Sequence, residues 1–305
     1  MTRKKKEPER TTIITSPNRR PYGAKLTLLL EKYTNFHIYG ECTLLVKPDI
    51  ILRIEPKKLR YQEEESWEIY VEGFSTAGEA EQFGLKVALG FLWTAVQGHY
   101  SARLLYQTPL PCFVYDRTRS MGPFMSAFGT VSQTKGIADI VDPLDQIISS
   151  RKDIDPRLLV ALEIFVASRL ETTERARFLG IASSIEPIAV QEKYEDENLV
   201  SLISEFKTKL NDSDISQNIK DSLQGRIDQL RVESVSKAIK RLINKSLPDN
   251  PDALEIIEEA YGLRSKILHE GSTDADLQQK SQKVEEVIRK IFEKYISDYL
   301  NNEHK

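Results

Sequence analysis

Two kinds of hydrophobic pattern divide the chain. Between Lys25 and about Val71, short apolar runs are separated by turn signals such as Pro48-Asp49, which is typical of strands. Beyond about Asp139, apolar residues recur at intervals of three and four, which is typical of amphipathic helices. The pattern predicts an α+β N-terminal domain with a mainly antiparallel sheet, followed by an all-α helical bundle.

The N-terminal half contains several expected strands and one clear helix. The strand-like runs are LTLLL, FHIYGECTLLV, IILRIEP, WEIYVEG, ARLLYQ and CFVYD. Between the fourth and fifth runs, Thr76 can cap a helix with Glu79 as its capping-box partner. An apolar stripe from Phe83 to Ala95 continues that helix. Residues 118–137 carry three glycines and little periodicity, so we expect a long loop there.

The C-terminal half predicts five to seven helices. The first opens with Asp155 as N-cap and Pro156 at the first helical position. In the second, Pro187 predicts a kink or break. We therefore divide the chain into a disordered tail (1–22), an α+β domain (23–138) that senses or regulates, and a helical domain (139–305).

Composition narrows the class of protein. The chain has 305 residues, 29% of them charged, and a net charge of -3, which argues against a general nucleic-acid coat but leaves room for a local basic patch. No apolar run approaches the ~20 residues of a membrane span, and the basic N-terminus lacks a following hydrophobic core. We expect a cytoplasmic protein that does not interact with membranes.

The sequence contains no motif that indicates a metal site or a cofactor site. Cys42 and Cys112 are far apart and are expected to be small buried hydrophobes in a reducing compartment. His37, His99 and His304 show no ligand spacing, and no phosphate-binding glycine motif occurs. We expect no metal and no cofactor.

One late helix places an arginine where a leucine is expected. Asn250 and Pro251 predict its start and Gly271 its end. At about 100° per residue, Arg264 falls in the centre of an apolar arc. That arc consists of Leu254, Ile257, Tyr261 and Leu268, widened by Ile256, Ala260, Leu263 and Ile267. A guanidinium there has to be paired or has to face a cavity.

Two interpretations follow. In the first, Arg264 forms a structural ion pair with Glu186, and His269 is a helix C-terminal residue favoured by the dipole. In the second, Arg264 and His269 belong to a functional site. Gly262 and Ser265 then form a strip poor in side chains, along which a second molecule can approach closely.

The motif R-x4-H, from Arg264 to His269, resembles the signature of the HEPN superfamily. Together, RARFLGIASSIEPIA, ESVSKAIKRLINKSL and YGLRSKILHEG resemble its Apea-like branch, over roughly residues 150–300. The family often carries asparagine after the arginine, where this chain has Ser265. The N-terminal half resembles β-rich regions that precede such domains in bacterial defence proteins.

The resemblance implies a homodimer in which two motifs face each other, and a metal-independent endoribonuclease. Such enzymes act as toxins in toxin-antitoxin systems or as antiviral (antiphage) effectors, so an antitoxin or other regulatory partner is also implied. In this reading His269 exchanges protons with ribose and leaving-group oxygens, Arg264 binds the phosphate of an RNA substrate, and Glu270 supports His269. The alternative is a non-catalytic HEPN dimerisation or nucleotide- or RNA-binding module.

Overall fold

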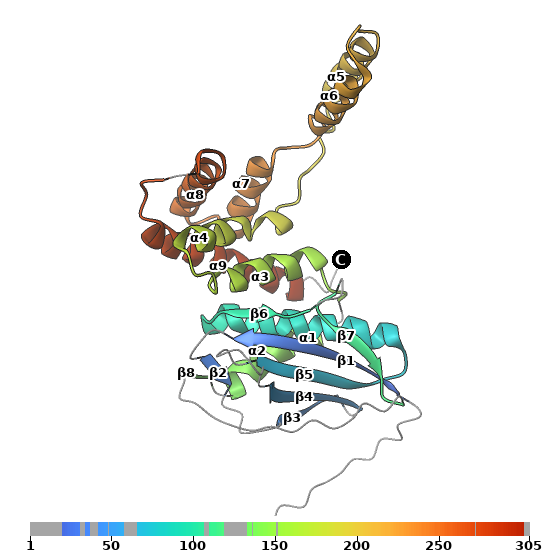
Figure 1. Ribbon diagram of the computed structural model, residues 1–305, viewed down its shortest axis with the longest axis vertical. Helices are drawn as coiled ribbons and strands as arrows, with labels where there is room; N and C mark the ends of the chain where they lie inside the picture. The colour runs from blue at the N-terminus through green and yellow to red at the C-terminus, as the bar shows by residue number, and fades with distance from the viewer. Residues whose placement is uncertain are drawn as a thin grey trace, which may run out of the picture. The chain divides into compact units, whose positions relative to one another are not determined.

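The computed structural model describes residues 20–30, 34–36, 42–47, 49–57, 66–106, 110–118, 133–135, 137–150, 152–271 and 273–301. By its internal contacts the chain divides into two compact units, Met1–Ile154 (unit 1) and Asp155–Lys305 (unit 2). Unit 1 combines a sheet with helices and the described part of unit 2 is helical (Figure 1). The predicted α+β region followed by a helical region is confirmed.

Unit 1 is built on a six-stranded antiparallel sheet in the order β3-β4-β5-β1-β6, with β7 also paired to β1. Buried residues alternate with partly exposed ones along much of β5, from Trp67 to Glu72, which is the two-residue period of a strand with one covered face. The strands are β1 (Tyr22–Leu30), β3 (Cys42–Lys47), β4 (Ile50–Lys57), β5 (Ser66–Phe74), β6 (Ala102–Leu104) and β7 (Phe113–Asp116). The tail predicted for 1–22 lies outside the described residues as far as residue 19, and Tyr22 already belongs to β1.

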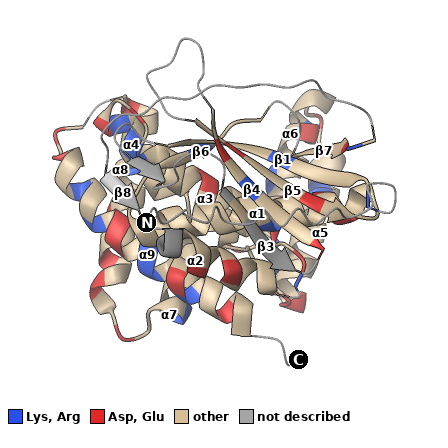
Figure 2. Cartoon of the chain, turned by 90° about the horizontal axis from the view of Figure 1, so that it is seen from below, with Lys and Arg blue, Asp and Glu red and all other residues tan. Residues whose placement is uncertain are grey.

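Helix α1 (Ala77–Gly98) packs on one face of this sheet (Figure 1). Its predicted capping box is confirmed: the Thr76 side chain accepts from the Glu79 amide, and the Glu79 carboxylate accepts from the Thr76 amide. The helix approaches β1 closely at Gly84, where an added Cβ would lie 2.8 Å from the Ala24 Cβ. The strands of the sheet carry charged positions of both signs, drawn blue for lysine or arginine and red for aspartate or glutamate in Figure 2.

Two features of unit 1 differ from the sequence prediction. Helix α2 (Ile137–Ser149) contacts α1, so the division between the units falls after Ile154 and not after residue 138. Within the segment expected to be a loop, β8 (Gln133–Lys135) pairs in parallel with β2 (Thr34–Phe36). Residues 119–132 of that segment lie outside the described part of the chain.

Cys112 is buried in unit 1, as predicted, whereas the Cys42 side chain lies outside the described residues. Burial, with a smaller contribution from the Glu81 carboxylate, raises the pKa of the Cys112 thiol to about 11. In a Cys42→Ser variant, we expect alkylation at pH 8 to be about 100-fold slower in the native protein than in the urea-unfolded protein, because only the thiolate reacts. Similar alkylation rates in the native and the unfolded protein would contradict a buried Cys112 thiol with a raised pKa.

Unit 2 contains seven described α-helices. In chain order its elements are α3 (Pro156–Ser168), α4 (Glu174–Ser183), the 3-10 helix η1 (Glu186–Ile188), α5 (Glu197–Asn211), α6 (Gln217–Gln229), α7 (Val235–Ser246), α8 (Pro251–Glu270) and α9 (Leu277–Asn301). Among the described residues of this unit, strand-like pairing is confined to a bridge between Lys193 and Val232. The all-α prediction for this half is therefore confirmed.

The core of unit 2 forms where α3, α4, α7 and α8 meet α9 and one another. Phe165 of α3 and Phe292 of α9 are both fully buried and meet edge to face, with ring centroids 5.3 Å apart. The predicted start of α3 is correct, because the Asp155 side chain accepts from the Arg157 amide. The predicted break at Pro187 is also correct, since α4 ends at Ser183 and η1 follows.

Helices α5 and α6 contact mainly each other. Lys207 of α5 and Asp228 of α6 form an ion pair of 2.5 Å between them. Several of their apolar side chains are exposed to solvent, namely Val200, Leu202, Phe206, Ile219 and Leu230. These two helices therefore contribute little to the core of the unit.

No described helix combines the length and the apolar character that crossing a membrane requires.

Candidate active site

Helix α8 carries the R-x4-H motif and has the predicted ends. It begins after Asn250, with Pro251 in its first turn, although the Asn250 side chain makes no capping hydrogen bond. It ends at Gly271, which adopts a left-handed conformation with φ of 74° that suits glycine. The motif thus occupies the last two turns of a 20-residue helix.

Arg264 lies on the buried line of α8. Ile257, Ala260 and Ile267 are all buried and follow the helical period, and Arg264 falls between the last two. Its side chain keeps 25% of its surface exposed, so it reaches from the core line to solvent. The placement of Leu268 in the buried arc is wrong: this residue is 55% exposed, although Ile267, about 100° away in the same turn, is buried.

The guanidinium group is held by two neighbouring elements. Its Nε donates to the Ser183 hydroxyl at 2.7 Å, at the end of α4. One terminal nitrogen, Nη2, lies 3.1 Å from the Glu186 carboxylate, at the start of η1. The ion pair of the first sequence interpretation therefore exists, and the Glu186 side chain in it is partly exposed.

Tyr261 completes this cluster from one turn below Arg264. Its hydroxyl donates to the same Glu186 oxygen at 3.1 Å, and the guanidinium carbon of Arg264 lies 5.7 Å from its ring centroid. Burial, followed by the charge of Glu186 and this hydrogen bond, raises the pKa of the Tyr261 phenol well above its ordinary range. Tyr261 is therefore a neutral donor that helps to fix Glu186, and Glu186 fixes Arg264.

These contacts leave donors of Arg264 unused. Nε and Nη2 have the partners described above, whereas Nη1 makes no hydrogen bond to a described residue. Since an arginine presents five N–H donors in a planar fork, the group retains donors that can bind an anion.

The other predicted site residues lie on the exposed side of α8. Gly262, Ser265, His269 and Glu270 are all exposed, and a Cβ added at Gly262 would meet nothing within 4 Å. Five residues along a helix correspond to about 140° of rotation, so His269 and Arg264 of one chain do not point the same way. The structure brings Arg264 and Glu186 together, and it leaves His269, Ser265, Gly262 and Glu270 separate from them.

Sequence reasoning missed two members of the cluster. Ser183 gave no signal because a hydroxyl near a helix end is common. Tyr261 was assigned only to the apolar arc, although tyrosine in a half-buried position usually needs a partner for its hydroxyl.

Removing the carboxylate charge tests how firmly the cluster is held. We expect Glu186→Gln to lower the free energy of unfolding by about 1 kcal/mol, because Arg264 loses its ionic partner while part of the site remains solvated. The measurement is urea unfolding. The matched control is Glu258→Gln, which removes the α8 partner of Lys240 in a surface ion pair between α7 and α8. We expect a change of less than about 0.5 kcal/mol there, and equal changes in both variants would contradict the argument.

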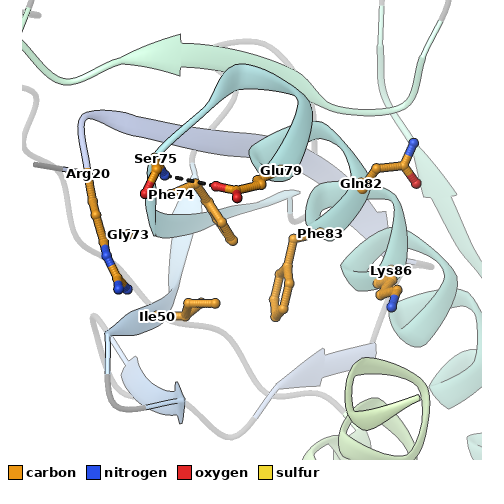
Figure 3. Close-up of a pocket in the computed structure, with 9 residues that line it drawn as sticks. All are labelled: Arg20, Ile50, Gly73, Phe74, Ser75, Glu79, Gln82, Phe83 and Lys86. Carbon is orange, nitrogen blue, oxygen red and sulfur yellow. Dashed lines mark hydrogen bonds between the residues drawn. The ribbon is translucent and has the colours of Figure 1, made fainter. Parts of the chain in front are cut away.

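Two cavities elsewhere do not include the motif. A groove of about 540 Å³ between α8 and α9 is lined by Ile256, Ala260 and Leu263, on a different side of α8 from His269. In unit 1, a pocket of about 370 Å³ opens between α1, β4 and β5 (Figure 3). Its two cations have partners: Arg20 pairs with Asp49 at 2.9 Å, and Lys86 donates to the Ser150 carbonyl.

Within the described residues, no group of three or more histidine, cysteine, aspartate or glutamate side chains is arranged to hold a metal ion. Comparisons with protein-family models, with curated proteins and with solved structures find no match to this chain.

Proposed function

We propose that this protein is a HEPN-type, metal-independent endoribonuclease that acts as a toxin or antiphage effector in the cytoplasm. The observation that carries the proposal is the arrangement of Arg264. Glu186, Ser183 and Tyr261 fix its orientation, Nη1 remains available, and an exposed histidine follows in the R-x4-H spacing. A fixed, partly exposed guanidinium is suited to bind a phosphate and to stabilise the negative charge that develops on it during the reaction.

In the proposed reaction the ribose 2′-oxygen attacks the adjacent phosphorus and the bond from phosphorus to the 5′-oxygen breaks. His269 accepts the 2′-hydroxyl proton or, when protonated, donates to the departing 5′-oxygen. Arg264 binds the non-bridging phosphate oxygens. The products are a 2′,3′-cyclic phosphate and a 5′-hydroxyl.

We further propose that two copies associate through α8 so that both motifs line one cleft. Within one helix, Arg264 and His269 point about 140° apart, so one chain does not bring both side chains to the same place. A second copy can supply the missing side chain, which supports a dimer. The exposed Gly262–Ser265 strip permits a close approach. In this proposal unit 1 senses a signal or restrains the nuclease, alone or with an antitoxin-like partner. A monomer in light scattering at micromolar concentration would contradict the dimer.

The test of the function is end-group analysis. The purified full-length protein is incubated with mixed RNA in EDTA, and the fragment ends are mapped. Fragments that end in 2′,3′-cyclic phosphate are expected. Cleavage that requires an added divalent ion, or fragments that end in a free 3′-hydroxyl, would contradict the proposed chemistry.

A second candidate is a non-catalytic HEPN dimerisation or nucleotide- or RNA-binding module. The observation in its favour is the same ion pair, since Arg264 with Glu186, Ser183 and Tyr261 is also what a structural role requires. The two candidates differ in one outcome. If the protein is a nuclease, replacing Arg264 or His269 abolishes RNA cleavage even when the stability of the protein is unchanged.

A further inference from the structure

The sheet of unit 1 has one face that packs under α1 and one that does not. Along β1, Ala24, Leu26 and Leu28 are fully buried on the α1 face, whereas Lys25 and Thr27 between them are only partly buried. The hydrogen-bonded register carries this alternation to the neighbouring strands. We call the side that bears Lys25 the open face.

Four side chains of the open face form a line across four strands. Arg53 of β4 is paired in register with Tyr70 of β5, Tyr70 with Lys25 of β1, and Lys25 with Phe113 of β7. The Arg53 guanidinium carbon lies 4.6 Å from the centroid of the Tyr70 ring, and the Lys25 ammonium lies 5.3 Å from it. Cations and aromatic rings thus alternate along a line that we call the cross-strand row.

Carboxylates pair with both cations of the row. Glu68 accepts from the Tyr70 hydroxyl and pairs with Lys25 at 2.7 Å, and its side chain is 13% exposed, against 26% for Lys25. Arg53 keeps 34% of its side-chain surface exposed while it pairs with Glu55. Glu55, with 32% of its side chain exposed, reaches solvent about as far as Arg53 and further than Lys25. The acids are thus placed to orient the cations of the row.

Phe113 is the most exposed member of the row, with 53% of its surface accessible. A phenylalanine on a sheet surface with no aromatic partner among the described contacts presents an open ring face. Together with the planar Arg53 guanidinium, which is backed by Tyr70, the row offers two flat groups separated by three strand spacings, about 14 Å. Lys25 lies between them.

We infer that the cross-strand row binds single-stranded RNA. Unpaired bases stack on aromatic rings and on arginine planes, and a cation between two stacking positions meets the connecting phosphate. In this assignment one base stacks on Phe113, another on Arg53, and Lys25 contacts the phosphate between them. The choice of RNA over other single strands rests on the proposed function.

The ion pairs of Arg53 and Lys25 determine how strongly RNA binding depends on salt. Because Arg53 and Lys25 already have carboxylate partners, few counterions are released when a phosphate is bound. Stacking therefore provides most of the affinity, and binding should weaken only modestly as salt increases. A double helix is excluded as a ligand of the row, since its bases are not available to stack.

The experiment measures binding of a fluorescent 2′-O-methyl oligonucleotide to the full-length protein by anisotropy. This probe lacks the attacking 2′-hydroxyl, so the readout does not depend on cleavage. Phe113→Ala is expected to weaken binding about 5- to 100-fold, which corresponds to the loss of one base–aromatic stack. Lys25→Gln is expected to weaken it severalfold. Circular dichroism melting confirms that each variant is folded.

The matched control is Phe206→Ala, which removes a similarly exposed phenylalanine (44%) from α5 in the other unit and should bind as the wild type does. No binding by the wild type in the high micromolar range, or unchanged affinity in both row variants, would overturn the inference. Clearly tighter binding of DNA or of duplex RNA would overturn the assignment to single-stranded RNA. If RNA binds through the row but is not cleaved, only the proposed nuclease function fails.

Discussion

Replacing His269 with alanine is expected to lower the rate of RNA cleavage at least about 100-fold, because a positioned general acid or base typically contributes a factor of 10² to 10⁴. The same change should alter the free energy of unfolding by less than about 0.5 kcal/mol. His269 is exposed at the end of α8 and contributes nothing to the core. A large loss of activity in an unchanged fold would thus separate chemistry from stability.

The measurement is the initial rate of cleavage in EDTA, with urea unfolding of the same preparations. A useful control is His99→Asn, because His99 is also exposed and lies in unit 1, after α1. It adopts a left-handed backbone with φ of 55°, which asparagine tolerates. We expect this control to cleave RNA at the wild-type rate. Equal activity of His269→Ala and the wild type would remove His269 from the mechanism.

Features with a strong local signal could be predicted from the sequence. The capping box of Thr76 and Glu79, the Asp155 cap of α3 and the glycine end of α8 depend on residues within one turn, and each is present. Local side-chain chemistry is sufficient for such features. The same holds for the position of Arg264 on the buried line of α8.

Features that depend on distant segments could not be predicted. Periodicity gives the direction of Leu268 but not whether a neighbour covers that side of the last turn, and the side chain is exposed. Helix α2 is not among the helices that the sequence predicts, and the local pattern of residues 137–149 does not indicate that α1 would cover such a helix. The parallel pairing of β2 with β8 joins two three-residue strands that are far apart in the chain, for which local pattern carries little information.

The candidate site shows the same division. The pairing of Arg264 with Glu186 followed from the requirement that a guanidinium on a core line has a partner, and the geometry confirms the pair. The hydrogen bond to Ser183 depends on where α4 ends relative to α8, which no local rule supplies. Variants that hold stability constant separate a structural role of the cluster from a role in binding phosphate.

Replacing both members of the ion pair with leucine provides such a variant. Arg264→Leu alone leaves the Glu186 carboxylate without a cation beside the Tyr261 hydroxyl, and should destabilise the protein by about 1–2 kcal/mol. In Arg264→Leu/Glu186→Leu no unpaired charge remains, and the free energy of unfolding should return to within about 1 kcal/mol of the wild type, because apolar replacement of an ion pair is often neutral.

Cleavage by this double variant is nevertheless expected to fall about 100- to 1000-fold, the usual effect of removing a donor that stabilises charge in the transition state. Urea unfolding and initial rates in EDTA are measured on the wild type, both single variants and the double variant. If the cluster were only structural, activity would follow stability, and the double variant would cleave RNA as the wild type does. Recovery of stability without recovery of cleavage would show that the cluster contributes to cleavage beyond its effect on stability, because the stable double variant lacks the charge and the N–H donors of Arg264.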